Sequence, residues 1–210
     1  MRTRESQKYS PELREQLMDL ETSIRAQIAV PKGGGIVTMG FPGLAFAVTG
    51  DAYIDPERMR ATLVHPALER CDVLIVLVEP EELPPGAMEV LQDLCADRDI
   101  SVLHLPIADY QVPGDRFAAG WETVAGRIDD ILQSGGTLAL SCHYGAGRSG
   151  MIAAGLLLEQ GLPLSEAILA VREQFPESIE SDVQLAWLAD KHAALSGARA
   201  TAMARHVFPD

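Results

Sequence analysis

Short apolar segments of strand type alternate with segments of helical periodicity along most of this chain. The clearest strand is a continuous apolar run at residues 72–78, which is rich in β-branched side chains and typical of a strand covered on both faces. Further strands are expected at residues 36–39, 101–105 and 137–141. Helical spacing predicts helices at residues 56–68, 87–95, 115–133, 149–160, 165–175 and from 179 to about 195. This order predicts an α/β fold with a central, mostly parallel sheet flanked by helices.

The two ends of the chain depart from this alternation. Apolar residues spaced three or four apart between residues 11 and 30 predict an amphipathic helix, and the Gly33-Gly34-Gly35 run predicts a flexible hinge after it. We therefore expect three parts: residues 1–35 as helix and hinge, residues 36–196 as one folded domain, and residues 197–210 as a weakly ordered tail. The polar first residues lead to no apolar signal core, and no run of about 18 apolar residues exists, so no membrane span is expected.

A cysteine and an arginine six positions apart lie where a predicted strand gives way to a predicted helix. The segment from Cys142 to Ser149 reads CHYGAGRS. Its two glycines allow backbone conformations that aim successive N–H groups at one point, and the start of the following helix adds the positive end of its dipole. A strand, a glycine-bearing loop and a helix N-terminus together are a common way to hold a phosphate.

The cysteine at the start of this loop adds a candidate nucleophile. Loop N–H groups, the helix dipole and Arg148 all favour negative charge at Cys142, and the thiolate is the attacking form of cysteine. Arg148 can bind two phosphate oxygens through its planar guanidinium. The alternative is a structural cysteine buried beside a helix cap. Cys71 and Cys95 lack such surroundings and are expected to be small core residues, with a regulatory disulfide to Cys142 as the alternative.

Three segments together resemble the cysteine-dependent protein tyrosine phosphatases. The loop from Cys142 to Ser149 is similar to the signature loop of that superfamily, and most of all to its dual-specificity branch. Residues 105–113 resemble the acid-bearing loop of the kinase-associated phosphatase group, and residues 179–184 resemble a glutamine-bearing stretch of the same group. The resemblance runs from about residue 36 to residue 188. It implies a phosphatase-type three-layer sandwich, with residues 36–196 as the phosphatase domain.

The resemblance also implies a role for each residue of the site. Cys142 would attack phosphorus and become a phosphocysteine, while Asp109 would protonate the leaving oxygen and then activate water. Ser149 would hydrogen-bond the cysteine sulfur and help it leave in the second step, and Gln184 would position the attacking water. The phosphate would be bound by Arg148 and by the backbone N–H groups of the residues that precede it: His143, Tyr144, Gly145, Ala146 and Gly147. Neither a metal nor a cofactor is implied.

Some of these assignments have rivals in the sequence. Asp109 precedes a Tyr-Gln-Val-Pro stretch, where an aspartate often caps a turn. Asp115 is a second candidate acid, although it fits better as the N-cap of the next helix. Gln184 is also consistent with an exposed helix residue. The superfamily usually has a histidine before its nucleophile, whereas this chain has Ser141 there and His143 after the cysteine.

The charge of the chain limits its partners. The formal net charge is −13 and the pI about 4.7, and residues 143–147 contain no Lys or Arg. This balance argues against nucleic acid, anionic membrane surfaces and polyphosphorylated inositides, and favours a phosphorylated protein or a small phosphate monoester. An odd number of cysteines, 3, indicates a reducing compartment, so we expect a cytoplasmic location. The histidines outside the loop show no metal-ligand spacing.

The sequence therefore predicts a metal-independent phosphatase that acts on phosphotyrosine, phosphoserine or phosphothreonine. Two alternatives use the same loop. One is a catalytically weak module that binds a phosphorylated partner, with the N-terminal helix as a docking element. The other is a sulfur-transferring or arsenate-reducing enzyme that uses Cys142, against which the upstream acid loop argues.

Overall fold

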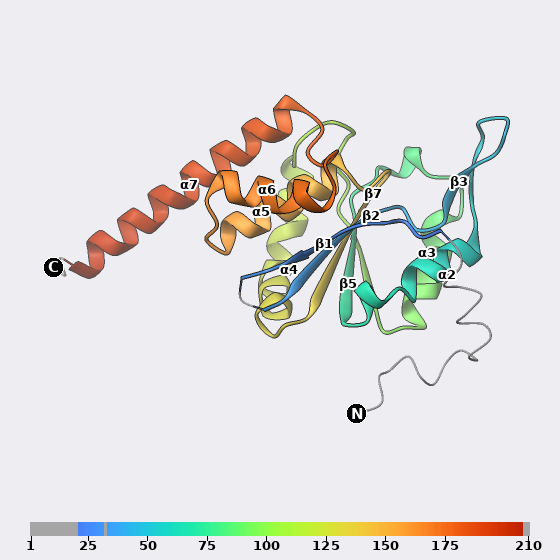
Figure 1. The fold of residues 1–210 in the computed structure, drawn as a ribbon, viewed down its shortest axis with the longest axis horizontal. Coiled ribbons are helices and arrows are strands. Elements are labelled where there is room, and N and C mark those ends of the chain that lie inside the picture. The colour runs from blue at the N-terminus through green and yellow to red at the C-terminus, as the bar shows by residue number, and fades with distance from the viewer. Residues whose placement is uncertain (1–20, 32, 208–210) are drawn as a thin grey trace.

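A five-stranded sheet forms the centre of the computed structural model, which describes residues 21–31 and 33–207 (Figure 1). The strands lie in the order β1-β2-β7-β5-β6. β1 runs antiparallel to β2, and the neighbours from β2 to β6 are all parallel. Their bounds are β1 Ile24–Ala29, β2 Gly35–Gly40, β5 Cys71–Val76, β6 Ser101–His104 and β7 Thr137–Cys142.

Helices cover both faces of this sheet (Figure 1). One face carries α4 (Asp115–Gln133), α5 (Gly147–Glu159), α6 (Leu164–Gln174) and α7 (Asp182–Val207). The other face carries α2 (Pro56–Leu63) and α3 (Ala87–Ala96). Two short 3-10 turns, η2 (Pro66–Leu68) and η3 (Pro80–Glu82), precede β5 and α3 respectively. The result is a three-layer sandwich, as the sequence predicted.

Each face of the sheet packs into its own apolar core. Because successive side chains of a strand point to opposite faces, Val73 and Ile75 of β5 belong to the core under α4–α7, and Leu74 and Val76 belong to the core under α2 and α3. All four side chains are buried, which explains why this strand reads as a continuous apolar run.

The predicted α/β order is confirmed for the central part of the chain. The helix expected at residues 115–133 matches α4 in both bounds. The other helices and strands of the sheet between residues 35 and 174 differ from their predicted ranges by a few residues, except that the helix expected at residues 56–68 ends at Leu63 and is followed by η2.

The predicted N-terminal helix is wrong where the structure describes it. Residues 24–29 form β1, whose register places Ile28 opposite Ile36 and Ala29 opposite Gly35. Spacing by four at Ile24 and Ile28 also suits the period of two of a strand, and pairing with the exposed edge of β2 decides between them. The rest of the predicted helix, at residues 11–20, lies outside the described residues. The domain therefore includes β1 and does not begin at residue 36.

The glycine run is a tight turn and not a hinge. The Val30 N–H donates to the Gly34 carbonyl at 2.9 Å, and the Gly33 N–H donates to the Val30 carbonyl at 2.9 Å. Gly33 has a φ of +103°, and a Cβ on Gly34 would overlap the backbone of Leu132 at the end of α4. Glycine is needed here for a close approach of two backbones.

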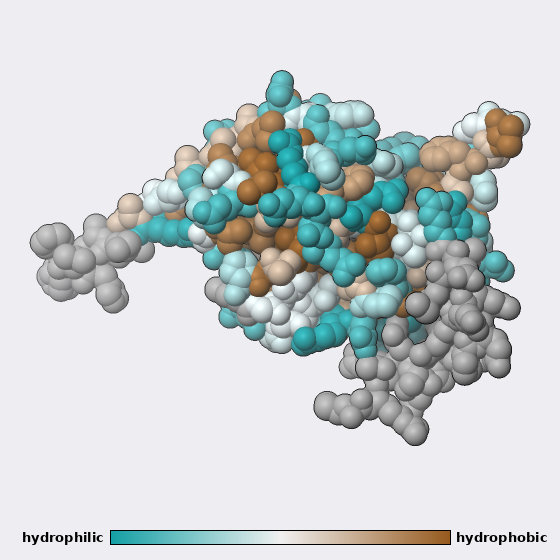
Figure 2. Space-filling view, in the orientation of Figure 1, coloured by the Kyte–Doolittle hydropathy of each residue, from teal (hydrophilic) through white to brown (hydrophobic). Residues whose placement is uncertain are grey.

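The chain also departs from prediction near its C-terminus and after β2. Helix α7 continues to Val207, so the expected weakly ordered tail is helical over residues 197–207, and Figure 1 shows that this end extends beyond the body of the molecule. A short hairpin of β3 (Leu44–Phe46) and β4 (Ala52–Ile54) projects from the opposite end (Figure 1 and Figure 2), and the sequence analysis did not predict it. No helix within the described ranges is long and apolar enough to cross a membrane.

Candidate active site

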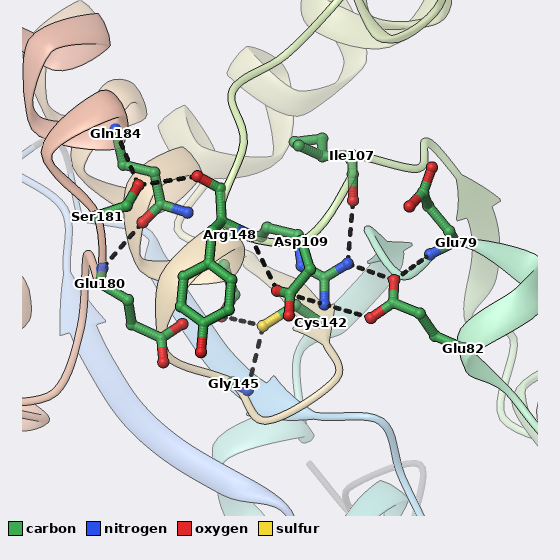
Figure 3. Close-up of polar contacts among 12 residues, drawn as sticks. Glu79, Glu82, Ile107, Asp109, Cys142, Gly145, Arg148, Glu180, Ser181 and Gln184 are labelled. Carbon is green, nitrogen blue, oxygen red and sulfur yellow. Dashed lines mark hydrogen bonds and ion pairs between the residues drawn. The ribbon is translucent and has the colours of Figure 1, made fainter.

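Strand β7 and helix α5 hold Cys142 at the carboxyl edge of the sheet. The cysteine ends β7, and α5 begins five residues later at Gly147. Its sulfur accepts a hydrogen bond from the Gly145 N–H at 3.1 Å and lies 3.4 Å from the Ser149 Oγ (Figure 3). Amide hydrogens and a helix N-terminus therefore surround the sulfur, an arrangement that favours negative charge on it.

The loop after Cys142 is held in shape by β2. Gly145 has a φ of +98°, and a Cβ there would overlap the backbone of Gly40. Only glycine meets both requirements at this position. Ser141, which replaces the usual histidine of the superfamily, is buried and donates from its Oγ to the Gly40 carbonyl at 3.3 Å. The serine thus ties the end of β7 to the end of β2, beside the loop.

Arg148 is fixed by a carboxylate that the sequence analysis did not identify. Its side chain is 2% exposed, and its Nη1 and Nη2 donate to the two carboxylate oxygens of Glu82 at 2.6 and 2.8 Å. Nη1 also donates to the Ile107 carbonyl at 3.0 Å. Glu82 ends the 3-10 turn η3, where the Glu79 N–H donates to its Oε2 at 2.9 Å. The guanidinium is therefore oriented before any substrate binds.

Glu82 and Arg148 shift each other's pKa. Burial alone would raise the pKa of Glu82, but hydrogen bonds from Arg148 and from the Glu79 backbone outweigh it and lower that pKa. Burial alone would lower the pKa of Arg148, but the hydrogen bonds to Glu82 outweigh it and raise that pKa. Both groups are charged at neutral pH.

Glu82→Gln is expected to loosen Arg148 and to destabilise the fold. The loss of a charged hydrogen-bond acceptor corresponds to about 1–3 kcal/mol, which lowers the melting temperature by several degrees and kcat/KM by about tenfold. Since the folded-state pKa of Glu82 lies below its unfolded value, the pair stabilises the fold above the unfolded value. The contribution is lost as the pH falls through the folded pKa.

Thermal unfolding between about pH 2.5 and pH 7 measures this difference in stability. The matched control is Glu81→Gln, because Glu81 is exposed on the same turn. If the two variants lost melting temperature and kcat/KM equally, or if Glu82→Gln changed neither, the positioning role of Glu82 would be contradicted.

Asp109 lies on the same edge of the sheet as Cys142. The chain beyond β6 keeps its pairing with β5, because the Leu105 N–H donates to the Val76 carbonyl and the Ile107 N–H to the Leu77 carbonyl, both at 2.9 Å. This leads Asp109 to the site, where its Oδ1 lies 3.2 Å from Nη2 of Arg148 and half of its side chain is exposed. The rival acid, Asp115, begins α4 and does not line the site.

The loop that carries Asp109 is tied to the start of α7. Tyr110 has a φ of +57°, a conformation that is uncommon for a side chain of this size. Its carbonyl accepts a hydrogen bond from Ser181 Oγ at 2.9 Å, and that oxygen in turn accepts from the Gln184 N–H at 3.2 Å (Figure 3). Ser181 therefore links the acid-bearing loop to the glutamine-bearing segment.

Gln184 is buried, so the alternative of an exposed helix residue is wrong. Its Oε1 accepts from the Glu180 N–H at 2.9 Å, whereas its Nε2 is buried without a hydrogen-bond partner. A Cβ on Gly147 would lie 3.2 Å from this Nε2. The Gln184 amide thus points toward the loop between Cys142 and Ser149.

The predicted residues converge on one cavity of about 260 Å³. Of the residues that the sequence analysis assigned, Cys142, Arg148, Asp109, His143 and Tyr144 line it. Ser149, Gly145 and Gly147 surround the sulfur or the start of α5, and Ala146 caps that helix. Two further lining residues, Tyr110 and Glu180, had been quoted only as parts of similar segments.

Comparisons with known proteins agree with this geometry. The model of a family described as "Polymorphic toxin system, DSP-PTPase phosphatase" matches residues 70–162, which include Asp109 and the whole loop from Cys142 to Ser149. This part of the chain, 93 of its 210 residues, is therefore similar to dual-specificity phosphatases. A search of curated protein sequences found no match.

Solved structures of such phosphatases share its fold. Kinase associated phosphatase with a serine in place of its catalytic cysteine superposes with a TM-score of 0.65 and 19% identity, over 85% of this chain and 98% of that one. Tk-PTP in its active form superposes with a TM-score of 0.57 and 23% identity, over 81% of this chain and 97% of that one. Human DUSP28 superposes with a TM-score of 0.55 and 14% identity, over 82% of this chain and 95% of that one.

The other two cysteines of the chain are core residues, as expected. Burial raises the pKa of Cys71 to about 12 and that of Cys95 to about 12, so both thiols stay protonated. They lie in the core under α2 and α3, whereas Cys142 belongs to the core on the other face. A disulfide between Cys142 and either of them would require the backbone to move, so that alternative does not fit the fold.

A metal-binding cluster does not occur in the described part of the chain. Within residues 21–31 and 33–207, no three His, Cys, Asp or Glu side chains are placed so that they could hold a metal ion.

Proposed function

We propose that this chain hydrolyses phosphate monoesters, on phosphotyrosine, phosphoserine or phosphothreonine, through a metal-independent phosphocysteine mechanism. The observation that carries the proposal is the convergence of three groups on one cavity. These are the sulfur of Cys142 at the start of the loop, the buried guanidinium of Arg148 and the carboxylate of Asp109.

In the first step, the phosphate would bind to Arg148 and to the loop N–H groups. The Cys142 thiolate attacks phosphorus, so an S–P bond forms as the P–O bond to the leaving group breaks. Asp109 gives its proton to the leaving oxygen, because an alkoxide is a poor leaving group. The loop N–H groups, the Arg148 guanidinium and the dipole of α5 stabilise the charge on the transferring phosphoryl group.

In the second step, a water molecule attacks the phosphocysteine. Asp109, now ionised, takes a proton from the water, and Gln184 Nε2 is the donor that would orient it. The P–O bond forms as the S–P bond breaks, and the sulfur leaves as a thiolate. The Ser149 Oγ, at 3.4 Å from the sulfur, supports that departure. Inorganic phosphate is the product.

The direct test is hydrolysis of para-nitrophenyl phosphate in the presence of a chelator. Steady turnover without added metal and competitive inhibition by vanadate are expected, since vanadate resembles the phosphoryl group in transfer. A strict requirement for a divalent cation would contradict the mechanism. Two alternatives remain. A catalytically weak module that binds a phosphorylated partner would show no turnover in this test, and sulfur transfer or arsenate reduction through Cys142 leaves no role for Asp109.

The charge of the chain and its free cysteines support two further elements of the proposal. A net charge of −13 favours a phosphorylated protein or small ester over polyanionic ligands. The three cysteines are unpaired, which supports a reducing compartment such as the cytoplasm.

A further inference from the structure

Glu180 places a carboxylate on one of the N–H groups that would bind phosphate. The residue comes just before α7, and its carboxylate lies against Gly147, whose backbone N–H lowers the pKa of that carboxyl. Gly147 is the first residue of α5, and a Cβ on it would overlap Glu180 Oε2. Figure 3 shows the Glu180 carboxylate directed toward the Cys142 sulfur. An internal anion thus uses a donor that a substrate oxygen needs.

The backbone that carries Glu180 is held firmly. Ile179 has a φ of +63°, a strained conformation for a β-branched residue that persists only where the surroundings enforce it. Arg172 donates from Nε to the Ser178 carbonyl and from Nη2 to the Ile179 carbonyl, both at 3.0 Å. The Glu180 N–H donates to Gln184 Oε1 at 2.9 Å. The fold therefore sets the place of this side chain.

The Glu180 side chain itself is exposed to solvent. Other charged groups face it from the neighbouring elements. Burial, Asp109 of the acid-bearing loop and Glu177 raise the pKa of Glu180, while the Gly147 N–H and Arg148 act in the opposite direction. The remaining titratable groups that line the cavity are Cys142, His143, Tyr110 and Tyr144.

We propose that Glu180 is an anion gate, a carboxylate that competes with the substrate's phosphate for the Gly147 N–H and must swing out or take up a proton before the phosphate binds. The proposal rests on the proposed function, because it assigns regulation to the same phosphate-binding loop. An ionised Glu180 weakens oxyanion binding both by occupying the donor and by repelling the anion. A neutral Glu180 does neither, so the site accepts oxyanions best at mildly acidic pH.

The test measures sulfate binding by calorimetry on Cys142→Ser protein, with and without Glu180→Gln, at constant ionic strength. Sulfate keeps its charge over the pH range used, and the serine removes the thiol from the site. At about pH 7.5 the Glu180→Gln protein is expected to bind sulfate about fivefold more tightly, and at about pH 5 less than twofold. Taking the ratio of the sulfate affinities of the two proteins at each pH removes effects of pH that both proteins share.

Glu177→Gln is the matched control, because it removes the same charge from a neighbouring exposed carboxylate that does not line the cavity. It is expected to change sulfate affinity by less than about twofold. Equal gains in the two variants would mean a general charge effect and would overturn the gate. Unchanged or weaker binding in Glu180→Gln would overturn it as well, and Glu180→Ala distinguishes an effect of the glutamine amide.

The readout does not depend on turnover. If sulfate binds as expected but the wild-type protein hydrolyses no monoester, the gate stands and the proposed hydrolysis fails. If hydrolysis is normal and Glu180→Gln lowers kcat without any gain in sulfate affinity, the proposed function stands and the gate fails.

Discussion

Replacement of Cys142 by serine is expected to abolish turnover of para-nitrophenyl phosphate, by at least about 10⁴-fold, while oxyanion binding remains. A hydroxyl is a far weaker nucleophile than a thiolate at neutral pH. The groups that bind the phosphate are left in place, since Arg148 is held by Glu82 and by the Ile107 carbonyl and not by the sulfur. Initial rates on purified protein, with a melting curve for each variant, measure the effect.

Cys71→Ser is the matched control for this experiment. The Cys71 Sγ contacts the Val73 carbonyl at 3.3 Å, and a serine hydroxyl can donate to the same oxygen. The control is expected to lose some stability but to keep kcat. Sustained activity in Cys142→Ser would eliminate the phosphocysteine intermediate. The inactive protein can also retain a phosphorylated substrate and so reveal what it is.

Asp109→Ala is expected to slow the hydrolysis of alkyl phosphates by about 10²–10⁴-fold, with a smaller loss on aryl phosphates that have good leaving groups. The physical reason is that a nitrophenolate leaves without a proton, whereas the alkoxide of serine does not. Arg148 keeps its bidentate partner Glu82 in this variant, so phosphate binding is retained. The measurement is kcat on phosphoserine peptide and on para-nitrophenyl phosphate.

Asp115→Asn is the control, because Asp115 is exposed in the first turn of α4 and does not line the cavity. It is expected to leave both rates unchanged. If Asp109→Ala lost the same factor on both substrates, another residue would be the acid. A large loss in Asp115→Asn would point to Asp115.

The part of the site that follows from strand–loop–helix order could be predicted. Cys142 and Asp109 each follow a strand whose carboxyl end lies on the same edge of a parallel sheet, so their meeting needs only the order of the elements. Arg148 and Ser149 fall in the first turn of the next helix, and their relation to the sulfur is fixed by local geometry.

The parts that depend on long-range contacts could not be predicted. Glu82 lies in a 3-10 turn far from Arg148 in the sequence, and nothing local distinguishes it from Glu81 beside it. Glu180 reads as the polar start of a helix, and its contact with the Gly147 N–H depends on how α7 packs on α5. The spacing of Ile24 and Ile28 suited helix and strand equally, until the edge of β2 was known.

Strand β1 has a consequence for the integrity of the whole sheet. It covers the edge of β2, which would otherwise present a row of unpaired N–H and carbonyl groups to other molecules. Arg25 of this strand also reaches the site, donating from Nε to the Tyr144 carbonyl at 3.0 Å while its guanidinium lies over the Tyr144 ring. A chain that began at residue 36 would therefore lose the Arg25 contact that holds the loop after Cys142. It would also expose a sheet edge prone to self-association.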